Sequence, residues 1–82
     1  MNNMLESRGN NNYHIEAPML IDEISSTEIY LGFSKGSSDP SKPNWRIKRI
    51  WKIGSVWKMG FPKGNQDYIN VWDDRFTYLY GI

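Results

Sequence analysis

Hydrophobic and basic residues alternate along residues 45–53, which read Trp-Arg-Ile-Lys-Arg-Ile-Trp-Lys-Ile. Successive side chains of a β-strand point to opposite faces, so this alternation predicts a strand. One face would carry Trp45, Ile47, Trp51 and Ile53, and the other would carry Arg46, Lys48 and Lys52. Arg49 interrupts the apolar face and Ile50 interrupts the basic one. We therefore expect both faces of this strand to make contacts.

The same alternation predicts further strands over residues 28–33, 56–61, 68–72 and 75–80. Gly54-Ser55 fits a tight turn, and Asp73-Asp74 would form the last turn. Residues 34–43 form a longer loop, rich in Ser, Pro and Lys. The expected fold is a small all-β domain, an antiparallel meander or sandwich of about five strands.

The N-terminal part of the chain has a different composition. Residues 1–12 are rich in Asn and offer little to bury, which favours an arm over residues 1–25 ahead of a β-domain over residues 26–82. Residues 18–24 fit either a short helix that begins at Pro18 or an extended segment on a neighbour. We expect neither a signal peptide nor a membrane-spanning segment, and synthesis in a cytoplasm.

Composition favours association with partners. The chain has 82 residues, no cysteine and 15% aromatic residues. A chain of this length has a thin core, and it carries more aromatic rings than such a core needs. The net charge is only +1, but residues 40–66 contain no acidic residue, whereas the N-terminal third is acidic. Such asymmetry fits a nucleic-acid surface or two complementary surfaces that meet between subunits. We favour the second interpretation, since the basic residues alternate with apolar ones.

Candidate catalytic and metal-binding residues are few. His14 is the only histidine, and nothing near it in the sequence supplies further metal ligands. Asp73 and Asp74 are adjacent, so in a strand they would point to opposite faces and could not act as a pair. The sequence contains no nucleophile–base set and no phosphate-binding glycine loop. We expect a protein that is not an enzyme and needs no metal or cofactor.

The order of motifs resembles a short module of tailed-bacteriophage virion proteins. A Tyr-x-Gly strand (Tyr30-Leu-Gly-Phe33) is followed by a Trp-x-Ile-x-Arg-Ile strand (Trp45 to Ile50), then by Trp72-Asp-Asp-Arg75 and an aromatic strand. The most characteristic positions are Trp45, Arg49, Trp72, Asp73 and Arg75. We expect them to form a fold-defining or interface cluster, in which Trp45 packs against Trp72 and Arg49 or Arg75 pairs with Asp73.

The resemblance implies a non-enzymatic structural protein of the virion, in the head, neck or tail, that decorates the particle or anchors fibres. Its partners would be its own copies, as a trimer or another closed oligomer, and other virion proteins, and it would be made in the cytoplasm of a bacterial host. One alternative is a nucleic-acid-binding module, with Arg46, Lys48 and Lys52 on phosphates and Trp57 or Tyr68 stacked on bases. Another is a receptor- or glycan-binding tip built from the loop at residues 34–43 and an exposed tryptophan.

Overall fold

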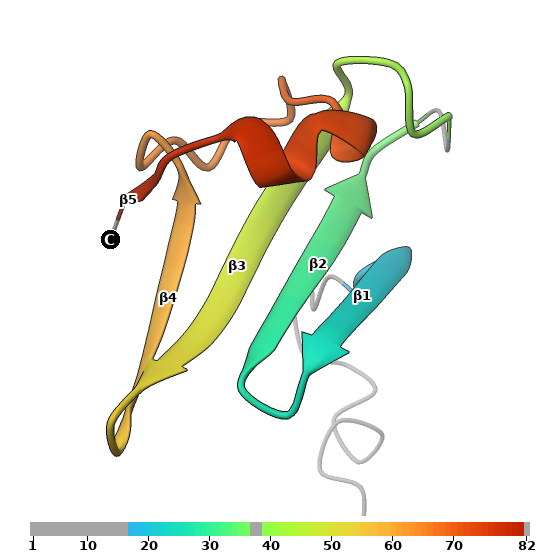
Figure 1. Cartoon of the computed structure of the whole chain (residues 1–82). Helices are drawn as coiled ribbons and strands as arrows, with labels where there is room; N and C mark the ends of the chain where they lie inside the picture. Colours follow the sequence, from blue (N-terminus) through green and yellow to red (C-terminus); the bar gives the residue numbers. More distant parts are fainter. Residues whose placement is uncertain (1–16, 37–38, 82) are drawn as a thin grey trace, which may run out of the picture.

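The protein forms one antiparallel sheet whose strands follow one another in chain order (Figure 1). The computed structural model describes residues 17–36 and 39–81. Its strands are β1 (Leu20–Ser25), β2 (Glu28–Ser34), β3 (Trp45–Ile53), β4 (Val56–Pro62) and β5 (Tyr80–Gly81), with a 3₁₀-helix, η2 (Trp72–Thr77), between β4 and β5. The predicted all-β antiparallel meander is confirmed, in the form of one five-stranded sheet.

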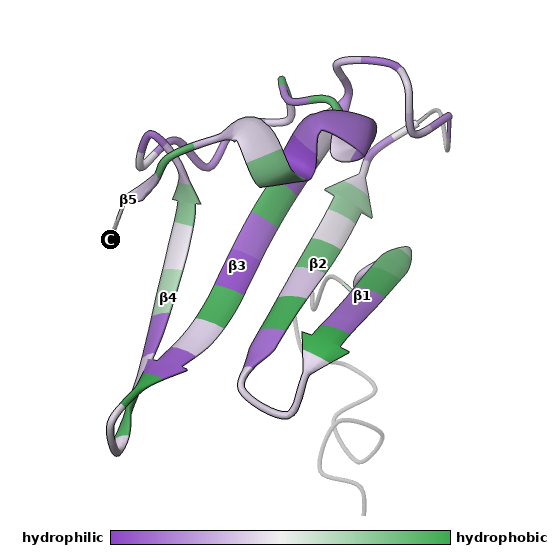
Figure 2. Cartoon of the chain, in the orientation of Figure 1, coloured by the Kyte–Doolittle hydropathy of each residue, from purple (hydrophilic) through white to green (hydrophobic). Residues whose placement is uncertain are grey.

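Three of the predicted strands lie where the alternation placed them, as β2, β3 and β4. The β3–β4 hairpin turns at Gly54-Ser55, as expected, and pairs Ile53 with Val56. Gly54 has a φ of 62°, a left-handed conformation that glycine adopts without steric cost. Figure 2 shows hydrophobic and hydrophilic residues alternating along β3.

The C-terminal quarter departs from the prediction. In place of a strand over residues 68–72 there is an isolated bridge between Asn70 and Trp45, and η2 occupies the first half of the strand expected over residues 75–80. A 3₁₀-helix brings residues three apart onto one side. Arg75 thereby stacks on the Trp72 ring at 4.6 Å and donates a hydrogen bond to the Trp72 carbonyl at 3.1 Å. This contact depends on the helical turn, whereas the alternation of aromatic residues predicted a strand.

Residues 20–25 are a strand, not a helix. Leu20–Ser25 pairs with β2, and the Met19 N–H donates to the Gly32 carbonyl. The extended alternative is therefore the correct one, although the neighbour is β2 of the same chain. The expected boundary between residues 25 and 26 falls in the turn between β1 and β2. Residues 1–16 of the expected arm, including His14, lie outside the described residues.

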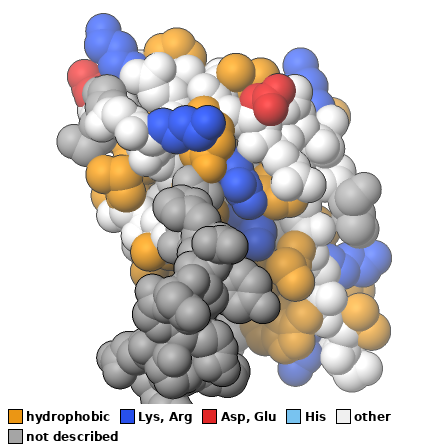
Figure 3. Space-filling view, turned by 180° about the vertical axis from the view of Figure 1, so that it is seen from behind, with side chains coloured by type: hydrophobic (Ala, Val, Ile, Leu, Met, Phe, Trp, Pro, Cys, Tyr) orange, Lys and Arg blue, Asp and Glu red, His pale blue; other side chains and the backbone are white. Residues whose placement is uncertain are grey.

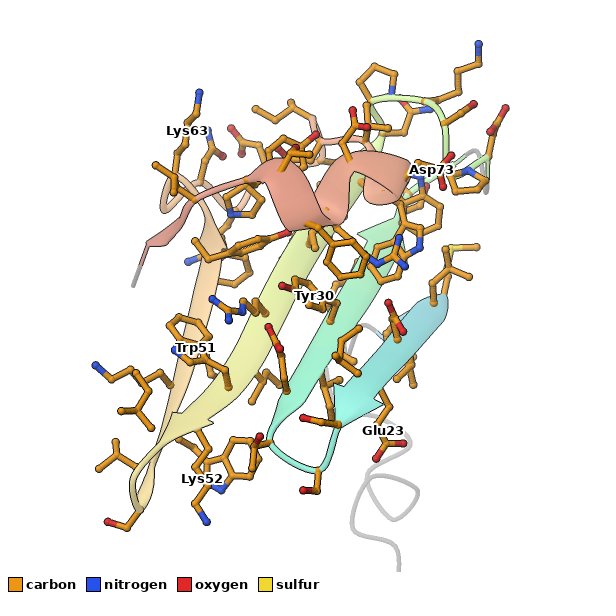
Figure 4. The ribbon with its side chains drawn as sticks, viewed as in Figure 1. Glu23, Tyr30, Trp51, Lys52, Lys63 and Asp73 are labelled. Atoms are coloured by element: carbon orange, nitrogen blue, oxygen red, sulfur yellow. The ribbon has the colours of Figure 1, made fainter. Side chains whose placement is uncertain are left out.

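The core lies on one face of the sheet, beneath η2. Tyr30, Trp45, Ile47 and Trp72 form the buried cluster. η2 crosses this face at one end of β2 and β3, and Tyr30 lies beneath it (Figures 1 and 4). The expected packing of Trp45 against Trp72 is present, with ring centroids 6.0 Å apart. Trp45 is fully buried, and its indole N–H donates to the Asp39 carbonyl, which satisfies the polar atom of the ring.

Candidate interaction surface

The two faces of the sheet have different surroundings. We call the face beneath η2 the packed face and the opposite one the open face. By strand alternation and register, the open face carries Ile29, Leu31 and Phe33 from β2, Arg46, Lys48, Ile50 and Lys52 from β3, and Trp57, Met59 and Phe61 from β4. Within residues 17–36 and 39–81, no helix or strand lies across the open face. Figure 3 shows basic and hydrophobic side chains side by side when the molecule is seen from behind.

Arg46 is the centre of an aromatic group at one end of the open face. Its guanidinium carbon lies 5.3 Å from the Phe33 ring centroid, 5.5 Å from that of Phe61 and 5.9 Å from that of Tyr68. Its Nη1 donates to the Tyr68 hydroxyl at 3.5 Å. Residues 67–69, which follow β4, thus bring a tyrosine ring to the margin of the open face.

Lysines of the open face and of the adjoining loop also lie against rings. The ammonium of Lys48 is 5.7 Å from the Phe61 centroid, and that of Lys52 is 5.6 Å from the Trp57 centroid. Lys35, in the loop after β2, lies 4.7 Å from the Tyr68 centroid. Trp57 remains 48% exposed. The face therefore presents cations and partly exposed rings in alternation.

A shallow pocket adjoins this aromatic group. It is lined by Lys35, Gly36, Asn44 and Tyr68 and has a volume of about 340 Å³. Lys35 and Asn44 flank the loop between β2 and β3, and they contribute an ammonium group and a side-chain amide. The strand pattern pointed to Arg46, Lys48 and Lys52 but gave no sign of Lys35 or Asn44, because residues of a loop follow no alternation.

Two carboxylates of the packed face form ion pairs with arginines. Glu28 accepts from Arg49, with an N–O distance of 2.7 Å, and Asp22 accepts from Arg75 at the same distance. The expectation that Asp73 would bind one of these arginines is therefore wrong. Asp73 is exposed in the first turn of η2, whereas the Arg75 side chain extends toward β1.

The characteristic residues form a structural cluster in part. Trp45, Trp72 and Arg75 are in contact along the packed face. Arg49 lies farther along β3, between Glu28 and the ring of Trp51, whose centroid is 4.4 Å away. Trp45, Trp72 and Arg75 thus attach the C-terminal segment to the sheet, and Asp73 lies outside the cluster.

The surroundings of two tyrosines and one aspartate shift the pKa values of these side chains. Burial raises the pKa of Tyr80 strongly, and its hydroxyl donates to the Arg75 carbonyl at 2.7 Å. Burial also raises the pKa of Tyr30, with a further contribution from Glu28 that Arg49 opposes. The Ser41 backbone N–H and hydroxyl both donate to Asp39 and lower the pKa of its carboxyl. These interactions hold the fold together, and none creates a catalytic pair.

Among the described residues, no group of three or more His, Cys, Asp or Glu side chains is placed to hold a metal ion. No helix in this part of the chain has the length and apolar character needed to cross a membrane. Comparison with protein-family models, curated proteins and solved structures found no match to the chain.

Proposed function

We propose that this protein is a non-enzymatic structural component of a tailed-bacteriophage particle that binds its own copies and other virion proteins. The motif order supports this role. Trp45, Trp72 and Arg75, which belong to the characteristic positions, make the contacts that hold η2 against the sheet. A pattern whose residues maintain a scaffold is consistent with a protein that acts through its surface.

One observation carries the proposal: the end of the β3–β4 hairpin is apolar and exposed. We call this surface the hairpin end, comprising Ile53, Val56, Trp57 and Met59, which are 57%, 56%, 48% and 53% exposed. Hydrophobic residues gather at this turn in Figure 2. Exposed apolar patches on small proteins mark contacts with other molecules, because burial of such surface is favourable.

The native mass in solution tests this proposal. Light scattering behind a sizing column should give a closed oligomer for the full chain. The double variant Ile53→Ser/Val56→Ser should shift the mass toward the monomer, since it removes apolar surface from the packed-face side of the hairpin end. Leu79→Ser is the matched control, because Leu79 is 80% exposed and lies outside the hairpin end.

A monomeric full chain would contradict the proposed self-assembly. An oligomer that persists in the double variant but dissociates with Leu79→Ser would place the contact elsewhere and remove the role of the hairpin end. Circular dichroism of each variant should match that of the parent, because the substituted side chains are exposed and contribute little to the core.

No observation favours the receptor- or glycan-binding alternative. Trp45, the tryptophan next to the loop at residues 34–43, is fully buried. The exposed Trp57 lies beyond the opposite end of β3. Loop and exposed ring therefore belong to different ends of the molecule.

A further inference from the structure

We infer that the outer edge of β4 pairs, in antiparallel orientation, with the outer edge of β1 from a second copy of this chain. The inference rests on the proposed function, because it names the surface of the next copy that the hairpin end meets. Three observations carry it: the position of the two strands at the sheet edges, the matching spacing of their outward backbone groups, and the complementary character of their side chains.

The sheet ends in β1 on one side and in β4 and β5 on the other (Figure 1). β5 covers only the far end of β4, where Gly81 pairs with Phe61 and Tyr80 pairs with Pro62. Within residues 17–36 and 39–81, no strand pairs with the outer edge of β1 or with that of residues 56–59. Such an edge is a template for another chain, because a further strand satisfies its backbone N–H and C=O groups.

The register shows which backbone groups point outward at each edge. The Lys52 N–H donates to the Thr27 carbonyl, so every second residue of β3 counted from Lys52 bonds toward β2 and the others bond toward β4. The same alternation, carried across the sheet, assigns the outward N–H and C=O groups to Trp57 and Met59 of β4 and to Ile21 and Glu23 of β1. Both edges thus present two outward residues with one residue between them.

One antiparallel register joins these two sets completely. It places Trp57 opposite Glu23 of the next copy and Met59 opposite Ile21, so that all four residues exchange ladder hydrogen bonds. β1 begins at Leu20, which this register places just before the residues of β4 that β5 covers. The incoming strand therefore ends where β5 takes over the edge of β4.

The side chains agree with this register on both faces. On the packed face, Lys58 lies opposite Asp22 of the next copy, and opposite charges across a ladder stabilise it. Asp22 keeps its ion pair with Arg75, whose two hydrogen bonds go to Oδ2, while Oδ1 can accept from Lys58. On the open face, the exposed side chains of Ile21 and Met59 meet and bury apolar surface.

Pairing of like edges is the main competitor. Full overlap of β4 with a second β4 would place Lys58 opposite Lys58, and full overlap of two β1 strands would place Asp22 opposite Asp22. Like charges directly opposite destabilise a ladder. Charge complementarity therefore favours β1 of a second copy at the edge of β4. This contact repeats head to tail, and it forms a closed ring where the rotation between copies closes.

Disulfide trapping tests the inference, because the chain contains no cysteine of its own. After treatment with oxidised glutathione, Ile21→Cys/Met59→Cys should give covalent dimers and larger products on a denaturing gel, and a reductant should remove them. Opposite residues of a bonded antiparallel pair have Cα atoms about 5.5 Å apart, which suits a disulfide. Within one chain, three strand spacings of about 4.8 Å separate β1 from β4, which is too far for this bond.

The single-cysteine variants report which edges meet. Neither Ile21→Cys nor Met59→Cys should cross-link alone, whereas an equal mixture of the two should give a covalent dimer and nothing larger. Ile21→Cys/Leu79→Cys is the matched control and should stay monomeric on the gel, since Leu79 is exposed but lies outside the paired residues. Circular dichroism should show that all variants remain folded.

Lys58→Glu tests the charge pair. It places a carboxylate opposite Asp22 of the next copy, so the native mass by light scattering should shift toward that of the monomer. Lys63→Glu is the control of equal charge and should keep the mass of the parent, because Lys63 lies in the turn after β4.

A monomeric parent chain would contradict both this inference and the proposed self-assembly. An oligomer whose double-cysteine variant gives no cross-link would overturn the pairing of β1 with β4 and leave the proposed self-assembly intact. Cross-linking by either single variant alone would do the same, because it would show that like edges meet. Equal masses of Lys58→Glu and Lys63→Glu would contradict the register.

Discussion

Gly32 determines how closely the two tryptophans of the core approach the sheet. A Cβ at this position would lie 2.6 Å from Trp72 Cε3 and 3.1 Å from Trp45 Cε3. Both rings are buried and cannot move aside without disturbing their neighbours. The glycine of the Tyr-x-Gly motif is thus explained by close packing of aromatic rings.

Gly32→Ala should therefore destabilise the protein by about 1–3 kcal/mol, the usual cost of overpacking a core. The matched control is Gly36→Ala, because a Cβ at Gly36 would meet no atom within 4 Å. Urea unfolding followed by tryptophan fluorescence gives both free energies. Equal stabilities of the two variants would show that Trp72 does not pack against Gly32.

At the scale of elements, Arg75 connects η2 to β1. Its Nε and Nη2 both donate to Asp22 Oδ2, at 3.0 and 2.7 Å, while its guanidinium stacks on Trp72 and Phe76. The Arg75 and Asp22 side chains are only 18% and 28% exposed. This one side chain joins residues that are far apart in the sequence.

A double-mutant cycle of Asp22→Asn and Arg75→Gln should give a coupling energy of about 1 kcal/mol, measured by urea unfolding. The matched cycle of Asp73→Asn and Arg75→Gln should give a coupling energy near zero. A larger coupling energy for Asp73 than for Asp22 would show that Arg75 pairs with Asp73, the partner expected from the sequence.

The sequence predicted the elements whose signal is local. Alternation defined β2, β3 and β4, and Gly54 marked the hairpin turn. It failed over residues 68–80 because Phe76, Tyr78 and Tyr80 alternate as a strand would. In the structure Phe76 and Tyr80 instead pack edge-on against Tyr30, one from η2 and one from β5. That arrangement depends on contacts distant in the sequence.

The candidate surface, too, could be predicted from the sequence only where its signal is local. The strand pattern assigned Arg46, Lys48 and Lys52 to one face, and the register agrees. It could not show that Asp22 and Glu28 are neutralised by arginines on the packed face, since ion pairing is decided by the fold.

For the whole molecule, the central claim is that the part of the sheet beneath η2 provides stability and the exposed hairpin end provides contact. Tyr30, Trp45 and Ile47 bury one face beneath η2. The hairpin end lies beyond this core, at the turn between β3 and β4, which would allow one thin domain to keep its fold and bind other molecules at different places.

The native mass of Ile53→Ser/Val56→Ser, measured by light scattering beside that of Leu79→Ser, tests this division most directly. The double variant should have a smaller mass than the parent chain and keep its circular dichroism, while Leu79→Ser, outside the hairpin end, should keep the mass of the parent. A double variant that keeps the mass of the parent chain, or one that loses its circular dichroism, would contradict the assignment of the hairpin end as a contact surface outside the core.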